Sequence, residues 1–246
     1  MESSSMDLWP SVTRHVGPPN RWQRWLRNVR ETPSAVLLFV QILLLFIYPF
    51  IETDVLGRYA KALIGAAALV VIYLAVRVVR ATPALTWVAA VLGGPVVLLT
   101  IAEAIWQDVT PLAFTSALLH AMFYFYIAYA LIRYMFADNW VTRDELFATG
   151  ATFTVVVWAY AYVYQTVQFI WPDSFTIHGE AGPGVRSWFE LLYLSVTTMT
   201  NTGLSDIVAV TPNVRSFVMV QMLSGILYVA LVVARLVGLT IMRFNR

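Results

Sequence analysis

The chain has 246 residues, of which 59% are apolar and 12% charged, with 16 basic and 14 acidic side chains. Soluble domains carry about a quarter charged residues, and the mean hydropathy here is +0.70. A soluble globular enzyme, a disordered tail and a nucleic-acid module are therefore excluded. The sequence contains no cysteine, which excludes disulfides and cysteine catalysis. The composition predicts a polytopic membrane protein.

The N-terminal part, residues 1–32, is predicted to be a cytoplasmic tail with an amphipathic helix. Trp22, Trp25, Leu26 and Val29 share one face of residues 20–30, and arginines occupy the other faces. This pattern is typical of a helix that lies in the membrane interface. It fits either a specific contact with anionic lipid or an ordinary basic anchor.

Long apolar runs follow the tail. A helix needs about 20 apolar residues to cross a bilayer. Runs without Asp, Glu, Lys or Arg occupy 34–51, 84–102, 111–132, 146–170 and 216–234, and a shorter run occupies 62–76. We therefore expect an all-α membrane protein with six transmembrane helices. The first four form a bundle at 33–136, and residues 137–145 form a cytoplasmic linker.

The basic residues predict the orientation of these spans. Twelve of the 16 lie in the tail, after the second span, after the fourth span and at the end of the chain. This distribution predicts that both termini are cytoplasmic. A voltage sensor needs several arginines within one span. The fourth span has only Arg133, at its end, so we expect no Arg-rich voltage sensor.

Residues 187–199, SWFELLYLSVTTM, form an apolar and aromatic segment of thirteen residues between the fifth and sixth spans. As a helix this segment is about 20 Å long, too short to span. The polar residues 200–206 follow it. Non-helical backbone at membrane depth must lie inside protein or along a water-filled path. This layout predicts a re-entrant helix and an ion pore. In the alternative interpretation, Gly203 only ends the helix and 200–206 form an outer loop.

The sequence TMTNTGLSD at 198–206 resembles the filter pattern T-x-T-T-V-G-Y-G-D of the tetrameric potassium channel superfamily. Thr198, Thr200, Gly203 and Asp206 match it. Pro212, Arg215, Met222 and Gly225 also fall where that family places them. The resemblance covers 146–246 and implies a pore domain with an outer helix at 146–170, a pore helix at 187–199, a filter at 200–206 and an inner helix at 214–244. The single-glycine filter is also similar to those of the Trk/Ktr/HKT potassium transporters.

The resemblance implies roles for individual residues. In a potassium channel, rings of backbone carbonyls replace the water around the ion. By resemblance, K+ would bind the backbone of Thr200, Asn201, Thr202, Gly203, Leu204 and Ser205. Asp206 would lie at the outer mouth, and Tyr193, Glu190 and Thr197 would support the filter. Gly225 would be the hinge of the inner helix, and its cavity and gate residues would be Ile226, Val229, Val233 and Val237.

The same resemblance implies a homotetramer in a lipid bilayer, in the cytoplasmic or plasma membrane. It implies no nucleic-acid partner, no cofactor besides K+ ions and no enzymatic activity.

Three departures from the family pattern leave the selectivity open. Ser205 replaces a glycine that is expected to be left-handed, which costs about 1–2 kcal/mol for a side chain. Leu204 lacks the phenol that braces the filter in the family. Asn201 is expected to place four amides at the cavity end. The alternatives are therefore a potassium channel, a weakly selective cation channel, a secondary transporter or membrane enzyme, and a non-conducting subunit.

Two further features also leave alternatives. Glu103 lies at the outer end of the third predicted span and His120 lies within the fourth. They would form either a proton-sensitive latch or, in the ordinary interpretation, a snorkelling carboxylate and a packing contact. Glu190 would either brace the filter or face the outer loop near Arg186.

Overall fold

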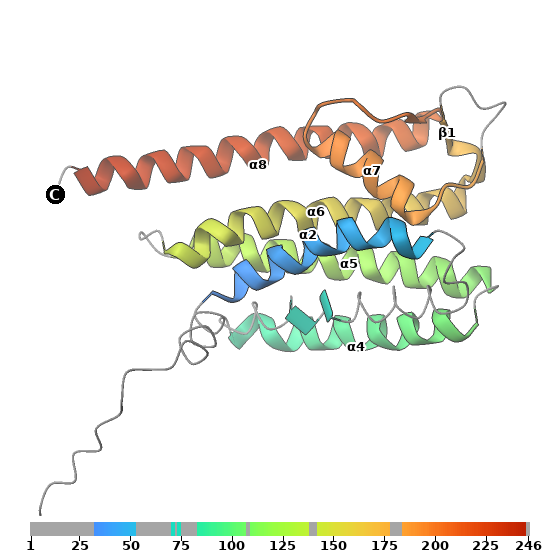
Figure 1. Cartoon of the computed structure of the whole chain (residues 1–246), viewed down its shortest axis with the longest axis horizontal. Helices are drawn as coiled ribbons and strands as arrows, with labels where there is room; N and C mark the ends of the chain where they lie inside the picture. Colours follow the sequence, from blue (N-terminus) through green and yellow to red (C-terminus); the bar gives the residue numbers. More distant parts are fainter. Residues whose placement is uncertain are drawn as a thin grey trace, which may run out of the picture.

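The computed structural model describes residues 32–52, 70–71, 73–74, 83–106, 109–137, 142–177 and 184–244. The predicted amphipathic helix at 20–30 lies outside them, as does most of the predicted span at 62–76. The described elements, labelled as in Figure 1, are α2 (Pro33–Glu52), α4 (Pro83–Ile105), α5 (Thr110–Met135), α6 (Arg143–Ile170), η1 (Pro172–Ser174), β1 (Phe175–Ile177), α7 (Trp188–Met199), β2 (Ile207–Ala209) and α8 (Pro212–Phe244).

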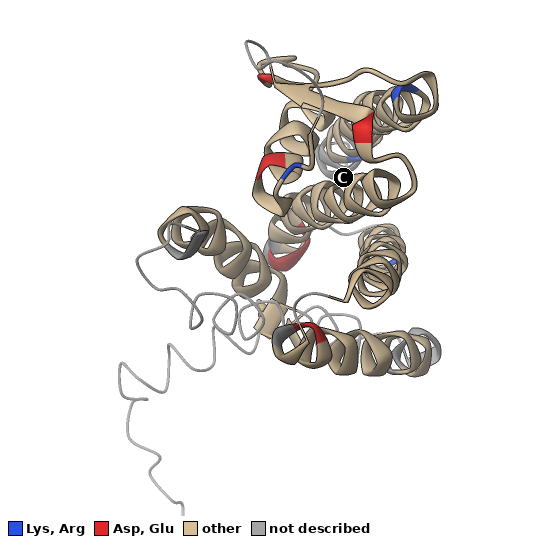
Figure 2. Cartoon of the chain, turned by 90° about the vertical axis from the view of Figure 1, so that its right-hand side faces the viewer, with Lys and Arg blue, Asp and Glu red and all other residues tan. Residues whose placement is uncertain are grey.

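Four of these helices are long and apolar enough to cross a membrane. Their spans are Pro33–Phe50, Thr110–Met135, Asp144–Ile170 and Pro212–Gly238, and α4 contains a shorter apolar stretch at Trp87–Glu103. Charged residues are sparse along the helices in Figure 2. The prediction of a helical membrane protein is confirmed. The count of six spans stays a prediction.

Helix α6 lies at the centre of the described structure and contacts α2, α5, α7 and α8. In Figure 1, α8 lies along one side of this bundle and α4 along the other. Between α5 and α6 the core is aromatic, with Phe123, Tyr124 and Trp158 buried. Gly150 lets α2 approach α6, because a Cβ at this position would lie 2.9 Å from Leu38 Cδ2.

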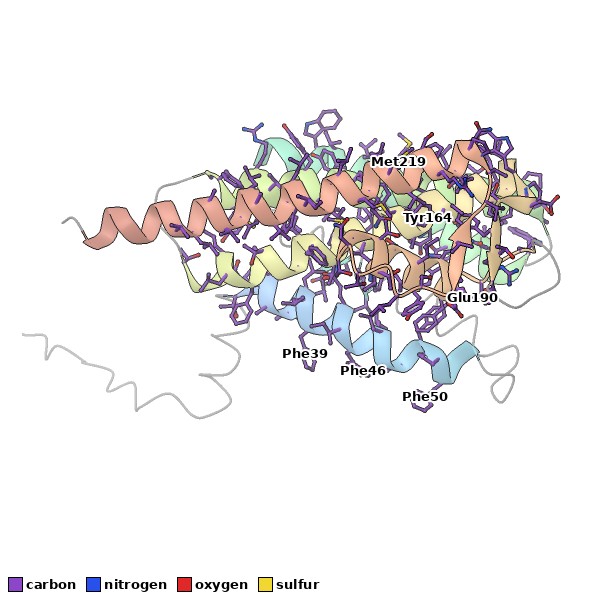
Figure 3. The ribbon with its side chains drawn as sticks, turned by 90° about the horizontal axis from the view of Figure 1, so that it is seen from above. Phe39, Phe46, Phe50, Tyr164, Glu190 and Met219 are labelled. Carbon is purple, nitrogen blue, oxygen red and sulfur yellow. The ribbon has the colours of Figure 1, made fainter. Side chains whose placement is uncertain are left out.

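The outer face of α2 is apolar and exposed along much of its length. Phe39, Phe46 and Phe50 are exposed and project away from the bundle in Figure 3. In a soluble protein such a row would be a liability, but lipid solvates it readily. The exposure agrees with a helix at the edge of a membrane bundle.

The first turn of α6 joins three other helices. Asp144 accepts hydrogen bonds from the backbone N–H and hydroxyl of Ser34 on α2, at 3.0 and 2.9 Å, and from the Tyr134 hydroxyl on α5, at 3.2 Å. The neighbouring Glu145 lies 3.4 Å from Arg235 of α8 in an ion pair. One helix end therefore connects α2 and α5 to the far end of α8.

Candidate pore loop between α6 and α8

The segment between α6 and α8 contains a small two-stranded sheet. Strand β1 pairs antiparallel with β2, with Phe175 opposite Ala209 and Ile177 opposite Ile207. Val210 N–H donates to the Ser174 carbonyl at 2.9 Å. The chain that follows α6 is thereby tied to the chain that leads into α8. The segment between them, which contains α7, therefore leaves the sheet and returns to it.

The beginning of α7 is fixed by a capping box. Ser187 Oγ accepts from Glu190 N–H at 3.3 Å, and Ser187 N–H donates to Glu190 Oε2 at 2.7 Å. Reciprocal bonds of this kind satisfy two amides at a helix start. Figure 3 shows Glu190 on α7. The contacts of Glu190 are thus with the backbone at the start of α7, next to Arg186 in the sequence. Its role as a filter support stays a prediction.

The end of α7 is closed by a left-handed asparagine. Asn201 has φ +55°, its N–H donates to Thr198 O at 3.1 Å, and Thr202 N–H donates to Thr197 O at 3.1 Å. This pair of bonds is the Schellman motif that ends many helices. Asparagine tolerates this conformation, whereas a β-branched residue does not. The geometry gives a physical reason for asparagine where the family pattern has threonine.

The loop after α7 departs from the expected filter conformation. Gly203 has φ +65°, but Ser205 is not left-handed, so the predicted strain at Ser205 is wrong. The Ser205 hydroxyl accepts from Ile207 N–H at 3.1 Å instead. A serine can hold this turn because its side chain bonds the backbone two residues ahead.

Residues of α7 hold this loop from one side. The Tyr193 hydroxyl donates to the Leu204 carbonyl at 3.1 Å. Thr197 O accepts from Thr202 N–H and, at 3.5 Å, from Gly203 N–H. A phenol therefore contacts the backbone of Leu204 although residue 204 itself is not tyrosine. Leu204 is 74% exposed, and the neighbouring residues 200–203 and Asp206 are also exposed.

Helix α8 passes very close to the end of α7. A Cβ at Gly225 would lie 2.2 Å from the Met199 carbonyl oxygen, which no side chain can tolerate. Asn201 Nδ2 donates to Met222 O at 3.3 Å and to Met199 O at 3.5 Å. The Asn201 amide thus bonds to α8 of its own chain, and its expected place at the cavity end of a tetramer stays a prediction. Gly225 lies within the continuous helix α8.

Sequence reasoning missed a buried polar network beneath this contact. Gln221 Nε2 donates to the carbonyl of Ser195 at 3.0 Å and to its hydroxyl at 2.7 Å. The Tyr164 hydroxyl donates to Gln221 Oε1, and the Ser195 hydroxyl donates to Val157 O at 2.7 Å. The network joins α6, α7 and α8. Its one sequence signal is a glutamine inside an apolar run.

One face of α8 carries the predicted cavity and gate residues. Ile226, Val229, Val233 and Val237 are each more than half exposed. Beyond α6 the C-terminal part of α8 extends past its neighbours in Figure 1. In the isolated chain these side chains therefore form a long, largely exposed apolar surface on α8.

Comparison with known families identifies this segment. Residues 151–241 match the model of the family Ion_trans_2, described as an ion channel. The match contains α7, the loop and most of α6 and α8. The segment is an ion channel domain, consistent with a pore module of the potassium channel superfamily, and the chain is a membrane protein that carries it. Neither the curated proteins nor the solved structures that were compared with the chain give a match.

Proposed function

We propose that the chain is one subunit of a homotetrameric channel that conducts K+ passively across a membrane. The observation that carries this proposal is the exposed loop at 200–206. It begins at the end of α7, is held by Tyr193 and Thr197, and lies within the ion channel domain.

The chemistry of the loop favours a cation over an anion. The C-terminus of a helix carries a partial negative charge, and the loop begins where α7 ends. Thr200 and Thr202 add exposed hydroxyls that are 3.1 Å apart. Asp206 is exposed at the other end of the loop, where four carboxylates in a tetramer would concentrate cations.

One pore segment per chain supports a tetramer. A ring of carbonyls around an ion needs several loops around one axis, and this chain supplies one. The exposed apolar face of α8, which carries Val229, Val233 and Val237, would line the cavity and the inner mouth. Four such faces close a pore by excluding water.

Weak selectivity is the second candidate, and the outer part of the loop favours it. Leu204 is largely exposed, and Ser205 bonds the backbone of Ile207 rather than adopting the left-handed conformation expected of the family. A filter with a loosely fixed outer half would discriminate poorly between K+ and Na+.

A reversal potential tests the proposal. Purified protein is placed in a planar bilayer with K+ on one side and equimolar Na+ on the other. Reversal displaced in the sense of K+ preference supports a K+ channel, and reversal near zero with clear current supports the weakly selective alternative. If the wild type carries no current, the matched variant is Val233→Asp, which places a carboxylate in the proposed gate so that water can enter it. No current from either protein, or a mass in detergent other than four chains, contradicts the proposal.

A further inference from the structure

A cluster of polar side chains, buried except for the half-buried Glu103, lies among α4, α5 and α6, separate from the pore loop. Its members are Thr100, Glu103, Ser116 and His120, and His120 is only 2% exposed. Ser116 Oγ donates to Glu103 Oε2 at 2.7 Å and lies 3.3 Å from His120 Nδ1. Thr100 Oγ1 lies 3.2 Å from His120 Nε2 on the other side of the ring.

The hydrogen bonds fix one proton of the imidazole. His120 Nδ1 lies 2.8 Å from the Ser116 carbonyl oxygen. A carbonyl only accepts, so Nδ1 carries a hydrogen. Toward His120 the Ser116 hydroxyl can therefore only accept, because it donates its own proton to Glu103. The sequence left open whether Glu103 and His120 are linked, and the structure joins them through this hydroxyl.

The second ring nitrogen, Nε2, can form a hydrogen bond with Thr100 whether or not it carries a proton. Thr100 Oγ1 lies 2.8 Å from Val96 O, to which it donates, and in that arrangement its lone pair accepts a hydrogen from Nε2 of a charged ring. If the Thr100 hydroxyl turns its proton to Nε2 instead, the ring is neutral. Both proton states therefore satisfy every nitrogen of the imidazole.

We propose that Glu103, Ser116, His120 and Thr100 form a proton-binding site that controls the support of the pore helix α7. The gain or loss of one proton at His120 changes the charge beneath the rings that lead to α7, with Glu103 as the counter-charge. The effect on current rests on the proposed function, but the proton site itself does not.

A series of ring contacts, one stacked and one tilted, connects this site to α7. The His120 ring stacks on Tyr162 of α6, with centroids 4.6 Å apart and an angle of 18°. Tyr162 lies 5.4 Å from Trp188, which is the first residue of α7. A positive ring attracts an aromatic face electrostatically. Proton binding at His120 would thus tighten the contact through which α6 meets the beginning of α7.

The titratable groups around His120 are few in the described residues. Glu103 comes from α4, Tyr124 from α5, with its ring centroid 6.4 Å from that of His120, and Tyr162 from α6. Tyr48 of α2 contacts Trp188 at 5.2 Å and lies within electrostatic reach of Tyr162. Of these groups, only Glu103 and His120 change charge below the range in which tyrosine ionises.

Histidine NMR tests the proton site without any need for current. The full chain carries His15→Gln and His178→Gln, so that ¹⁵N-labelled His120 is the only signal, and it is titrated in lipid nanodiscs from about pH 8 to about pH 4. We expect the Nδ1–H tautomer before protonation. Glu103→Gln is expected to need about tenfold more acid for half-titration. An Nε2–H tautomer, or a titration that Glu103→Gln leaves unchanged, overturns the site.

Bilayer currents test the link to the pore. In symmetric K+, wild type and the control His178→Gln are expected to change current together between about pH 8 and about pH 4, the range of the NMR titration, while His120→Gln loses that change. An identical profile in His120→Gln overturns the link. Absence of current in all three proteins refutes the proposed function, and the NMR titration still decides the proton site. Tetramer elution of each variant checks that it folds.

Discussion

Substitution of Gly225 by alanine separates two roles for this residue. A hinge needs backbone freedom, whereas a close approach needs the absence of a Cβ. In the structure the added Cβ would lie 2.2 Å from Met199 O, 3.0 Å from Met199 C and 3.3 Å from Asn201 Nδ2. The first two atoms are backbone at the end of α7 and cannot turn aside as a flexible side chain would.

The size of the effect follows from two opposing terms. Overpacking a well-packed contact costs about 1–3 kcal/mol, and a contact this short belongs at the upper end. Alanine in place of glycine inside a helix gains about 1 kcal/mol. We therefore expect Gly225→Ala to destabilise each chain by about 1–2 kcal/mol and to disturb the loop through Asn201.

Gly238→Ala is the matched control on the same helix, because a Cβ there would meet nothing within 4 Å. The assay is thermal unfolding of the detergent-solubilised protein, followed by the open probability of single channels in a planar bilayer. We expect Gly238→Ala to be neutral or stabilising, and Gly225→Ala to unfold earlier and Gly225→Val earlier still. Equal stability of Gly225→Ala and Gly238→Ala, with changed gating only in the former, would refute close approach and favour the hinge.

Three further predictions concern the loop and the ends of α6 and α8. Asn201→Thr restores the family residue but places a β-branched side chain at φ +55°, so thermal unfolding should show a loss of about 1–2 kcal/mol, whereas Asn201→Gly should lose less. Arg235→Gln breaks an ion pair with Glu145, whose side chain is 5% exposed. Denaturant unfolding should show that the free energy of unfolding falls by up to about 3–5 kcal/mol. Exchange of the two residues should recover part of this loss, and no recovery would argue against a paired role. Leu204→Tyr with Ser205→Gly should raise K+ over Na+ permeability in the reversal assay if the outer loop limits selectivity, and an unchanged ratio would place that limit elsewhere.

The pore segment is predictable because its signals are local. A run of thirteen apolar residues at 187–199 is too short to span, and the structure has α7 at Trp188–Met199. Ser187 and Glu190 stand at the spacing of a capping box, which is readable from the sequence alone. The family match at residues 151–241 bears out the resemblance that rests on the filter pattern.

The rest of the site depends on contacts between distant residues. The sequence does not show that the Met199 carbonyl faces Gly225, so a glycine in a helix is interpreted as a hinge. It does not show that Asn201 ends α7, so Ser205 is expected to be the left-handed residue that carries strain. Gln221 lies 26 residues from Ser195, and only the packing of α8 on α7 brings them together.

Helix α8 is held differently at its two ends, and the difference bears on where a gate could open. Near the loop, Gln221 lies in a fully buried network, and loss of such bonds leaves buried polar groups at a cost of about 1–3 kcal/mol each. At the far end, Arg235 is joined to Glu145 at 3.4 Å and lies 4.9 Å from the Phe136 ring.

The ion pair at the far end joins α8 to the first turn of α6, and the C-terminal part of α8 extends past its neighbours (Figure 1). Val233 and Val237 stand on either side of Arg235 in the sequence. Motion of α8 should therefore pivot about the packed contact at Gly225 and be largest at these valines. The same ion pair connects that motion to α6, whose first turn also binds α2 and α5 through Asp144. The proposed gate and the peripheral helices thus share one connection, at the beginning of α6.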